Sequence, residues 1–272
     1  MDRTVKILDF LASNKTVKIS LFAEILDVSN VTLRRDLDAL ENRGIIRRSH
    51  GYVSLDGADE TGKRIAFSHS IKRRIAKAAA GIIDDGETIM LESGSCCALF
   101  AEELAETKKN ITVITNSVFI SNHLCKLQKI KIILLGGYLQ PESRVLVGPI
   151  TAKCAENIYS DKFFIGADGF VPHFGFTGRE HLRAETAGEL AKRAKKVIIL
   201  TESAKFQRHG AYNLFQFDKI NCVFTDDGIP KEAEAVLIKN KIFINKVPFN
   251  EEKIKWRHFP GQPPFIYTEK DG

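Results

Sequence analysis

The sequence lacks the features of membrane-embedded and secreted proteins. Among its 272 residues, no uninterrupted apolar run reaches the roughly 18 to 20 residues that a membrane-spanning helix needs. The N-terminal segment contains acidic residues, and it has neither the apolar core nor the small-residue cleavage site of a secretory signal. We therefore expect a cytoplasmic protein.

Cysteine is scarce, and its spacing argues against a disulfide framework or a zinc finger. The five cysteines are an odd number scattered along the chain, with no CxxC pair and no Cys/His cluster at metal-ligand spacing. We expect reduced thiols, no metal and no cofactor. The sequence also has no GxxxxGK(S/T) phosphate loop, no HExxH helix and no GxSxG nucleophile turn. No common enzyme motif is therefore present.

Positive charge is in excess and is unevenly placed. The net charge is +6 and the isoelectric point is near 9.0, values that are compatible with a polyanionic partner. Three arginine pairs lie in the first third of the chain, at positions 34–35, 47–48 and 73–74. An anionic partner is therefore expected near the N-terminal part of the chain.

Residues 1–57 have the pattern of a small helical domain with a β-hairpin. Apolar spacing predicts three helices. The first covers about 2–12, the second begins after an N-cap at Ser20, and the third covers 30–43 after an N-cap at Ser29. Gly44 stands where a helix C-terminal glycine is common. Residues 45–53 then read as a hairpin that turns near His50 and Gly51. This order predicts a small α+β winged helix-turn-helix domain.

The third helix has the composition of a helix that reads the DNA major groove. Leu33, Leu37 and Leu40 form its buried stripe, so Val31 and Arg35 face away from the core. Arginine suits guanine edges or phosphates, and a methyl-bearing side chain suits thymine. The predicted DNA-contacting residues are Ser29, Asn30, Val31, Thr32, Arg34, Arg35, Arg47, Arg48 and His50.

A different pattern follows a linker that we place at 58–71. From 72 to 245, short apolar runs alternate with helical stretches, which predicts an α/β domain with an open, mainly parallel sheet. Strands are expected at 88–91, 111–115, 131–135, 162–165, 197–200, 222–225 and 241–244, and helices at 71–83, 98–106, 117–127, 185–193 and 231–239. The tail, 246–272, contains prolines that disfavour a helix and aromatic residues that suggest packing, but its role is open.

Polar and glycine-rich loops follow five of the expected strands. Ligands bind at the carboxyl ends of the strands in such sheets, and a helix N-terminus after a small polar loop suits a phosphate. The predicted effector-binding residues are Ser93, Gly94, Ser95, Cys96, Asn116, Gly136, Gly137, Asp168 and Lys205. The role of Asp168 is open among a helix cap, an acceptor for a sugar hydroxyl and a general base.

The chain resembles the DeoR-type family of transcription regulators. The head resemblance rests on VSNVTLRRDL at 28–37 and on RSHGY at 48–52, with Tyr52 where a second glycine is usual. In the body it rests on DGETIMLESGSC at 85–96, VITNS at 113–117, LLGG at 134–137 and SAKF at 203–206. Glu92 replaces an aspartate and Cys96 a threonine of the family pattern. The resemblance implies a sensor similar in fold to ribose-5-phosphate isomerase that binds phosphorylated sugars.

The expected function is therefore a DNA-binding regulator, a repressor of a carbohydrate operon, controlled by a phosphorylated sugar or related metabolite. Paired DNA half-sites need paired readers, so we expect a homo-oligomer, a dimer or a tetramer. Two alternatives stay open. One is a sugar-phosphate isomerase with Asp168 or Glu185 as base and Lys205 as electrostatic stabiliser. The other is a protein–protein adaptor.

Overall fold

The computed structural model describes residues 3–14, 16–55 and 60–249 of the chain. It divides into two compact units, a head that ends at Ser70 and a body that runs from Ile71 to Phe249. Within the described ranges, no helix combines the length and the apolar character that crossing a membrane requires. The expected tail lies outside the described residues from position 250 onward.

The head is a winged helix-turn-helix domain, as predicted. Its elements are α1 (Arg3–Ser13), β1 (Val17–Lys18), α2 (Ile19–Leu26), α3 (Asn30–Asn42), β2 (Ile46–Ser49), β3 (Tyr52–Leu55) and α4 (Glu60–Ala66). Strands β1, β3 and β2 form an antiparallel sheet in that order. Leu33, Leu37 and Leu40 of α3 are buried, and the rings of Phe10 and Phe22 pack with centroids 4.8 Å apart between α1 and α2. The apolar stripe of α3 thus faces the core of the head.

The start of α2 differs from the sequence expectation, which made Ser20 its N-cap. Lys18 is the N-cap residue, without a side-chain capping bond, and Ser20 lies inside the helix. The reason is the short strand β1, which pairs with β3, after which the Ile19 amide donates to the Gly51 carbonyl at 2.9 Å. Pairing with the wing therefore sets where α2 begins. The cap expected for α3 is confirmed at Ser29.

The segment expected to be a linker, 58–71, is largely helical. Helix α4 contacts α1 and β3 of the head, and its Ile65 and Ala66 are fully buried. Helix α5 (His69–Ala80) then begins two residues before the boundary between the two units. Turn formers and charged residues outnumber the apolar residues in this segment, so the sequence did not predict a helix. Helix α4 depends on the burial of Ile65 and Ala66 against the head.

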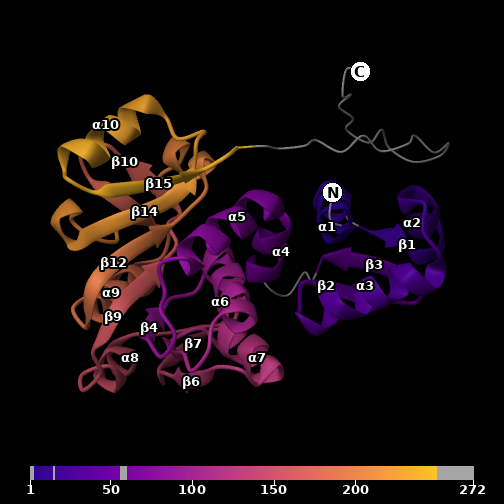
Figure 1. Cartoon of the computed structure of the whole chain (residues 1–272), viewed down its shortest axis with the longest axis horizontal. Coiled ribbons are helices and arrows are strands. Elements are labelled where there is room, and N and C mark those ends of the chain that lie inside the picture. The colour runs from indigo at the N-terminus through magenta and orange to yellow at the C-terminus, as the bar shows by residue number, and fades with distance from the viewer. Residues whose placement is uncertain (1–2, 15, 56–59, 250–272) are drawn as a thin grey trace. The chain divides into compact units, whose positions relative to one another are not determined.

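The body contains a seven-stranded sheet that is parallel throughout (Figure 1). Its strands are β4 (Thr88–Leu91), β5 (Thr112–Thr115), β6 (Lys131–Leu134), β9 (Ser160–Ile165), β12 (Ala194–Leu200), β14 (Ile220–Asp226) and β15 (Phe243–Val247). Each of the seven strands expected from the sequence overlaps one of these. The helices are α5, α6 (Ser95–Thr107), α7 (Val118–Leu127), α8 (Pro149–Cys154), α9 (His181–Ala191) and α10 (Lys231–Lys239). Each expected helix overlaps one of these as well.

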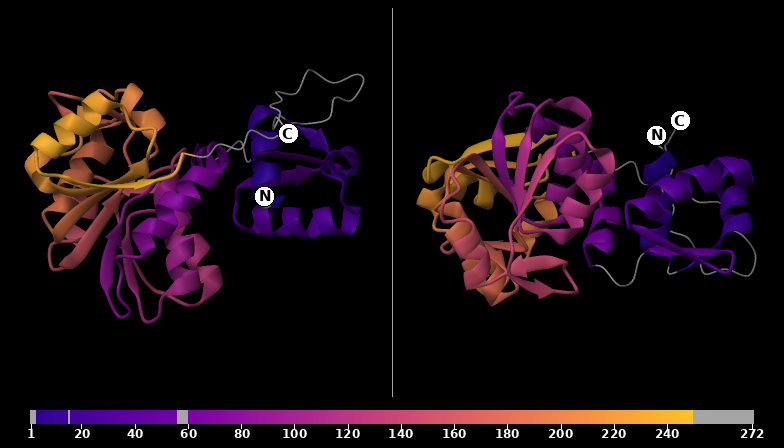
Figure 2. Two further views of the ribbon diagram at one scale, coloured as in Figure 1. Left: turned by 45° about the horizontal axis from the view of Figure 1, so that its top comes forward. Right: turned by 90° about the horizontal axis from the view of Figure 1, so that it is seen from below.

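The strand order places a topological switch point between β4 and β9. The order across the sheet is β15-β14-β12-β9-β4-β5-β6, so the chain moves outward one way from β4 and the other way from β9. Right-handed crossovers then put α6 and α7 on one face and α9 and α10 on the other (Figures 1 and 2). In open α/β sheets, a crevice for ligands forms at the carboxyl ends of the two strands at such a point.

Smaller elements that the sequence did not predict surround this sheet. They are β7 (Tyr138–Gln140), β8 (Val145–Val147), β10 (Gly169–Val171), β11 (Gly175–Gly178), β13 (Tyr212–Asn213) and the 3₁₀ helices η1 (Ser203–Gln207) and η2 (Phe217–Lys219). Strands β10, β11 and β13 form a second, antiparallel sheet.

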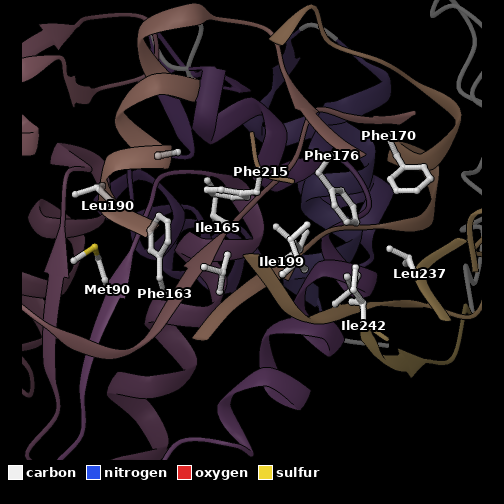
Figure 3. Packing of buried hydrophobic residues seen from close by; sticks show 14 of the residues in the cluster. Met90, Phe163, Ile165, Phe170, Phe176, Leu190, Ile199, Phe215, Leu237 and Ile242 are labelled. Carbon is white, nitrogen blue, oxygen red and sulfur yellow. The ribbon is translucent and has the colours of Figure 1, made fainter. Parts of the chain in front are cut away.

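An aromatic core joins the second sheet to the main one. Phe170 and Phe176 come from β10 and β11, and their ring centroids lie 5.1 Å apart. The ring centroid of Phe206, in η1, lies 5.2 Å from that of Phe170. Figure 3 shows Phe170 and Phe176 in one buried cluster with Phe163 and Ile199 of the main sheet. Apolar burial therefore fixes the segment after β9 over the carboxyl end of the sheet.

Candidate functional site

The N-terminal turn of α3 presents the predicted DNA-reading residues to solvent. The Ser29 hydroxyl accepts from the Thr32 amide at 3.1 Å, which caps the helix, and lies 2.9 Å from the Thr32 hydroxyl. Val31 is 64% exposed, and Arg34 and Arg35 are exposed beyond it. These side chains therefore form an accessible polar and basic surface of the kind that enters the major groove.

The wing turns where the sequence predicted, and both turn residues have positive φ. His50 has a φ of 50° and Gly51 a φ of 81°, the pairing expected of a tight type I′ hairpin. Tyr52 lies in β3, opposite Ser49 and Lys18, so the departure from the family pattern falls in the strand and not in the turn. Arg47 lies in β2, three residues before His50. Both residues are exposed on the hairpin.

Arg48 has a different environment from Arg47. Its guanidinium donates to Glu41 at 2.6 and 2.8 Å and to Asp38 at 2.5 Å, and its amide donates to Glu41 at 2.8 Å. Burial works against ionisation of Glu41, but the hydrogen bonds from Arg48 outweigh it and lower the pKa of Glu41. Arg48 therefore links strand β2 of the wing to α3, and its guanidinium pairs with two carboxylates of the head.

In the body, Glu92 and Ser93 follow β4 at the switch point and meet Arg183 of α9. One Arg183 Nη lies 3.2 Å from Oε1 of Glu92 and 2.8 Å from Oγ of Ser93. The Ser93 hydroxyl also donates to Glu92 at 2.9 Å. Burial raises the pKa of Glu92, while the Arg183 charge and the Ser93 hydrogen bond oppose that rise. The guanidinium is thus held at the carboxyl end of β4 by a buried carboxylate.

Arg183 is a site residue that sequence reasoning missed. It lies in the first turn of α9, where the Glu180 side chain caps the helix by accepting from the amides of Leu182 and Arg183 at 3.2 and 2.8 Å. The candidate residues were chosen from loops that follow the predicted strands. Arg183 lies in a helix and not in such a loop, so no sequence signal pointed to it. Its position depends on the second sheet, which the apolar pattern did not predict.

Asp168 lies near this cluster, after β9. Its carboxylate accepts from the Arg179 amide at 3.2 Å, and its charge acts on both Arg183 and Glu92. The next residue must be glycine, since a Cβ on Gly169 would lie 2.4 Å from the Arg208 carbonyl oxygen. Asp168 and Ser93 thus follow β9 and β4, which the sheet order makes neighbours, at the edge where the sequence analysis expected polar loops.

A second cluster surrounds the N-terminus of α6. Gly94 is the N-cap residue, with a φ of 133° and no side-chain capping bond to the first amides of the helix. Cys96, in the first turn, donates its thiol to Oε2 of Glu202 at 3.7 Å. Lys72 of α5 lies 3.7 Å from Oε1 of the same carboxylate, and the charge of Lys205 acts on Cys96. Burial raises the pKa of the Cys96 thiol strongly, so the thiol stays protonated.

The predicted residues after β5 and β6 have structural partners. Asn116 is buried and its amide donates to the Leu146 carbonyl at 3.0 Å. Gly137 packs on α8, where a Cβ would lie 1.9 Å from Oγ1 of Thr151, and a Cβ on Gly136 would lie 3.4 Å from the Cys154 sulfur. The close approach that these glycines permit is therefore to α8. The convergent part of the predicted set is 93–96 with Asp168 and Lys205.

The convergent residues can bind an anion at the carboxyl edge of the sheet. The first amides of α6 carry the positive end of the helix dipole. Lys72, Lys205 and Arg183 add side-chain charge nearby, and a guanidinium or ammonium forms charge-assisted hydrogen bonds to phosphate or carboxylate oxygens. Hydroxyl-bearing and acidic residues, Ser93 and Asp168, lie beside them and suit the hydroxyl groups of a sugar.

Two family models match the chain. The model described as a DeoR-like helix-turn-helix domain matches residues 3–57. The model described as a DeoR C terminal sensor domain matches residues 68–227. Together they span the head up to residue 57 and most of the body.

Curated relatives match over most of their length. The chain is 32% identical to the HTH-type transcriptional regulator GolR of Listeria innocua, over 85% of this chain and 92% of that protein. It is 30% identical to the HTH-type transcriptional repressor GlcR of Bacillus subtilis, over 87% and 92%. It is 29% identical to the L-fucose operon activator of Escherichia coli, over 83% and 94%. These relatives are all named as regulators of transcription or of an operon.

Solved structures resemble the body more distantly. A ribose-5-phosphate isomerase in complex with phospho-erythronic acid is 20% identical, with a TM-score of 0.39 over 51% of this chain and 54% of that chain.

Proposed function

This chain belongs to the DeoR family of transcription regulators, and we propose that it represses a carbohydrate-metabolism operon until a phosphorylated sugar or related metabolite binds its body. Family membership makes it a DNA-binding regulator with a sensor domain. The ligand class, the direction of control and the assembly of chains are our proposals.

The observation that carries the ligand proposal is the convergence at the switch point. Ser93, the α6 N-terminus, Asp168 and Lys205 come from loops after three strands, β4, β9 and β12, that lie side by side in the sheet. Such a site offers positive charge for a phosphate together with hydroxyl and carboxylate partners for a sugar. An apolar effector would cover these polar side chains without offering them hydrogen bonds in place of water, at a cost in affinity.

Repression is the direction that we favour for the head. A head of this kind contacts one half-site, so two chains on a two-fold symmetric operator would double the contacts. Ligand that binds the two states of the body with different affinity would shift the pair between strong and weak operator binding. We expect two or more chains for each operator duplex.

Fluorescence anisotropy of a labelled duplex from upstream of the gene's own cluster tests the proposal. The titration uses moderate salt and nonspecific competitor, with and without a panel of sugar phosphates. Tight binding that a sugar phosphate weakens is the expected result. Tight binding that no sugar phosphate changes would contradict the ligand proposal, and binding that a sugar phosphate strengthens would contradict the direction of control.

A further inference from the structure

Lys72 and Glu202 form a buried ion pair beside the proposed anion site. The Lys72 side chain is 3% exposed, and its Nζ lies 3.7 Å from Oε1 of Glu202. The other oxygen of Glu202 accepts from the Cys96 thiol at 3.7 Å. One carboxylate therefore joins the first turn of α5 to the first turn of α6 and to the segment after β12.

Lys72 lies at the point where the chain passes from the head into the body. Helix α5 begins at His69, and the boundary between the two units lies between Ser70 and Ile71. Lys72 is thus the second residue of the body, in the helix by which the chain enters it from the head. A shift of this first turn would be passed to the head along the covalent chain.

The pair is held by charge rather than by a hydrogen bond between its two side chains. A separation of 3.7 Å is longer than a hydrogen bond, so the attraction between Lys72 and Glu202 is Coulombic without a direct proton bridge. Removing both charges from water costs several kcal/mol per ion, and an ion pair at this distance returns only part of that cost. A phosphate dianion attracts an ammonium more strongly than a single carboxylate does, because it carries more charge.

We propose, resting on the function proposed above, that Glu202 acts as an internal anion that holds Lys72 while the sensor is empty. When a phosphomonoester binds at the α6 N-terminus, the Lys72 ammonium pairs with the phosphate and its ion pair with Glu202 is lost. The exchange moves the first turn of α5, and this movement reports the occupancy of the body to the head. Lys72 is thus a ligand-binding residue in the bound state, and Glu202 is a positioning residue that acts through it.

The proposal explains how binding can distinguish two states. In the empty state, Glu202 repels an incoming phosphate and competes with it for the ammonium. In the bound state, the phosphate supplies about −1.5 to −2 charges at neutral pH, against −1 for the carboxylate. The ligand then has different contacts in the two states, which is the requirement for a shift in population.

The decisive variant is Glu202→Gln, which keeps the shape of the side chain and removes its charge. Without the internal anion, ribose 5-phosphate or glucose 6-phosphate should bind on the order of tenfold more tightly, because the repulsion of a nearby carboxylate is removed. The ligand-free variant should also bind operator with an affinity shifted toward that of the ligand-saturated wild type. A purely structural role for Glu202 would not produce this second effect.

The ammonium is tested by Lys72→Met combined with Glu202→Gln. Lys72→Met alone would leave a buried carboxylate without its ion-pair partner and could unfold the body. The double variant keeps the charge balance, and we expect it to fold and to bind operator with little response to the sugar phosphates. Lys77→Met is the matched control, since Lys77 is an exposed lysine of the same helix, and it should retain the wild-type response.

Two results would contradict the proposal, and they are distinguishable. In the first, the wild type responds to a sugar phosphate but Glu202→Gln leaves both the ligand affinity and the operator affinity unchanged. This result would overturn the exchange at Lys72 and leave the proposed function standing. A wild type that binds operator but responds neither to the two sugar phosphates nor to inorganic phosphate overturns the proposed ligand class, and the exchange with it.

Discussion

At the scale of single residues, two neighbouring arginines of the wing have different surroundings. Arg47 is exposed in β2, whereas Arg48 is bound to Glu41 and Asp38 of α3. The sequence predicted both as DNA contacts because it shows their charge and not their partners. The structure assigns Arg48 to the fold of the head, so its effect on operator binding should come through the position of the wing.

Replacement of Arg48 by Ala should destabilise the head by about 1–2 kcal/mol, because it removes several charge-assisted hydrogen bonds at a partly exposed site. Hydrogen bonds from Arg48 lower the pKa of Glu41, so this stabilisation is present at neutral pH and is lost as pH falls through the lowered pKa, below the ordinary glutamate value of 4.5. Urea denaturation at several pH values measures both effects. An unfolding difference between wild type and variant that persists unchanged in strong acid would contradict the assignment.

Replacement of Arg35 by Ala should weaken specific operator binding by about 1–3 kcal/mol if the guanidinium reads a base edge from the exposed face of α3. Competition anisotropy against specific and unrelated duplexes measures the loss of discrimination. Lys77→Ala, which removes one positive charge from an exposed site in the body, is the control. An Arg35→Ala protein that matches this control at moderate salt would mean that α3 is oriented differently on DNA.

At the scale of elements, glycines show which loops are fixed by packing. Gly137 has a φ of 149°, and its hydrogen points at Thr151 of α8, where a Cβ would lie 1.9 Å from the hydroxyl oxygen. The LLGG motif therefore joins the end of β6 to α8. Gly188, inside α9, has no atom within 4 Å of a Cβ added at its position.

The two glycines predict opposite effects on stability. Gly137→Ala should destabilise the body by about 1–3 kcal/mol or more through overpacking and a strained backbone. Gly188→Ala should stabilise it by up to about 1 kcal/mol, since alanine is the better helix former. Thermal unfolding of both variants gives the comparison, and a Gly137→Ala protein as stable as wild type would show that α8 can move away from β6.

The same scale shows what could be read from the sequence. All seven strands of the main sheet and five of the loops at their carboxyl ends were predictable from short apolar runs, which in β4, β5, β9, β12 and β14 are buried and in the edge strands β6 and β15 are largely exposed. The second sheet was not, since β10, β11 and β13 have two to four residues each and depend on the phenylalanine cluster. Arg183, which that sheet helps to place, was missed for the same reason, and Lys72 was missed because its partner Glu202 is distant in sequence.

At the scale of the whole molecule, the chain passes from one unit to the other at the start of α5. The head presents the exposed turn of α3 and the wing, and we propose that the body binds an anion at its switch point. Coupling between two binding sites is reciprocal, so a ligand that lowers operator affinity must itself bind less tightly to the operator-bound protein, by the same factor. This equality requires no knowledge of the path between the sites.

The most direct test is therefore the affinity of the full chain for the sugar phosphates of the panel, measured by calorimetry with and without saturating operator duplex. We predict weaker ligand binding on DNA, by the factor that the same ligand produces in operator affinity. A ligand that binds with equal affinity in both conditions would contradict the central claim, because head and body would then act independently.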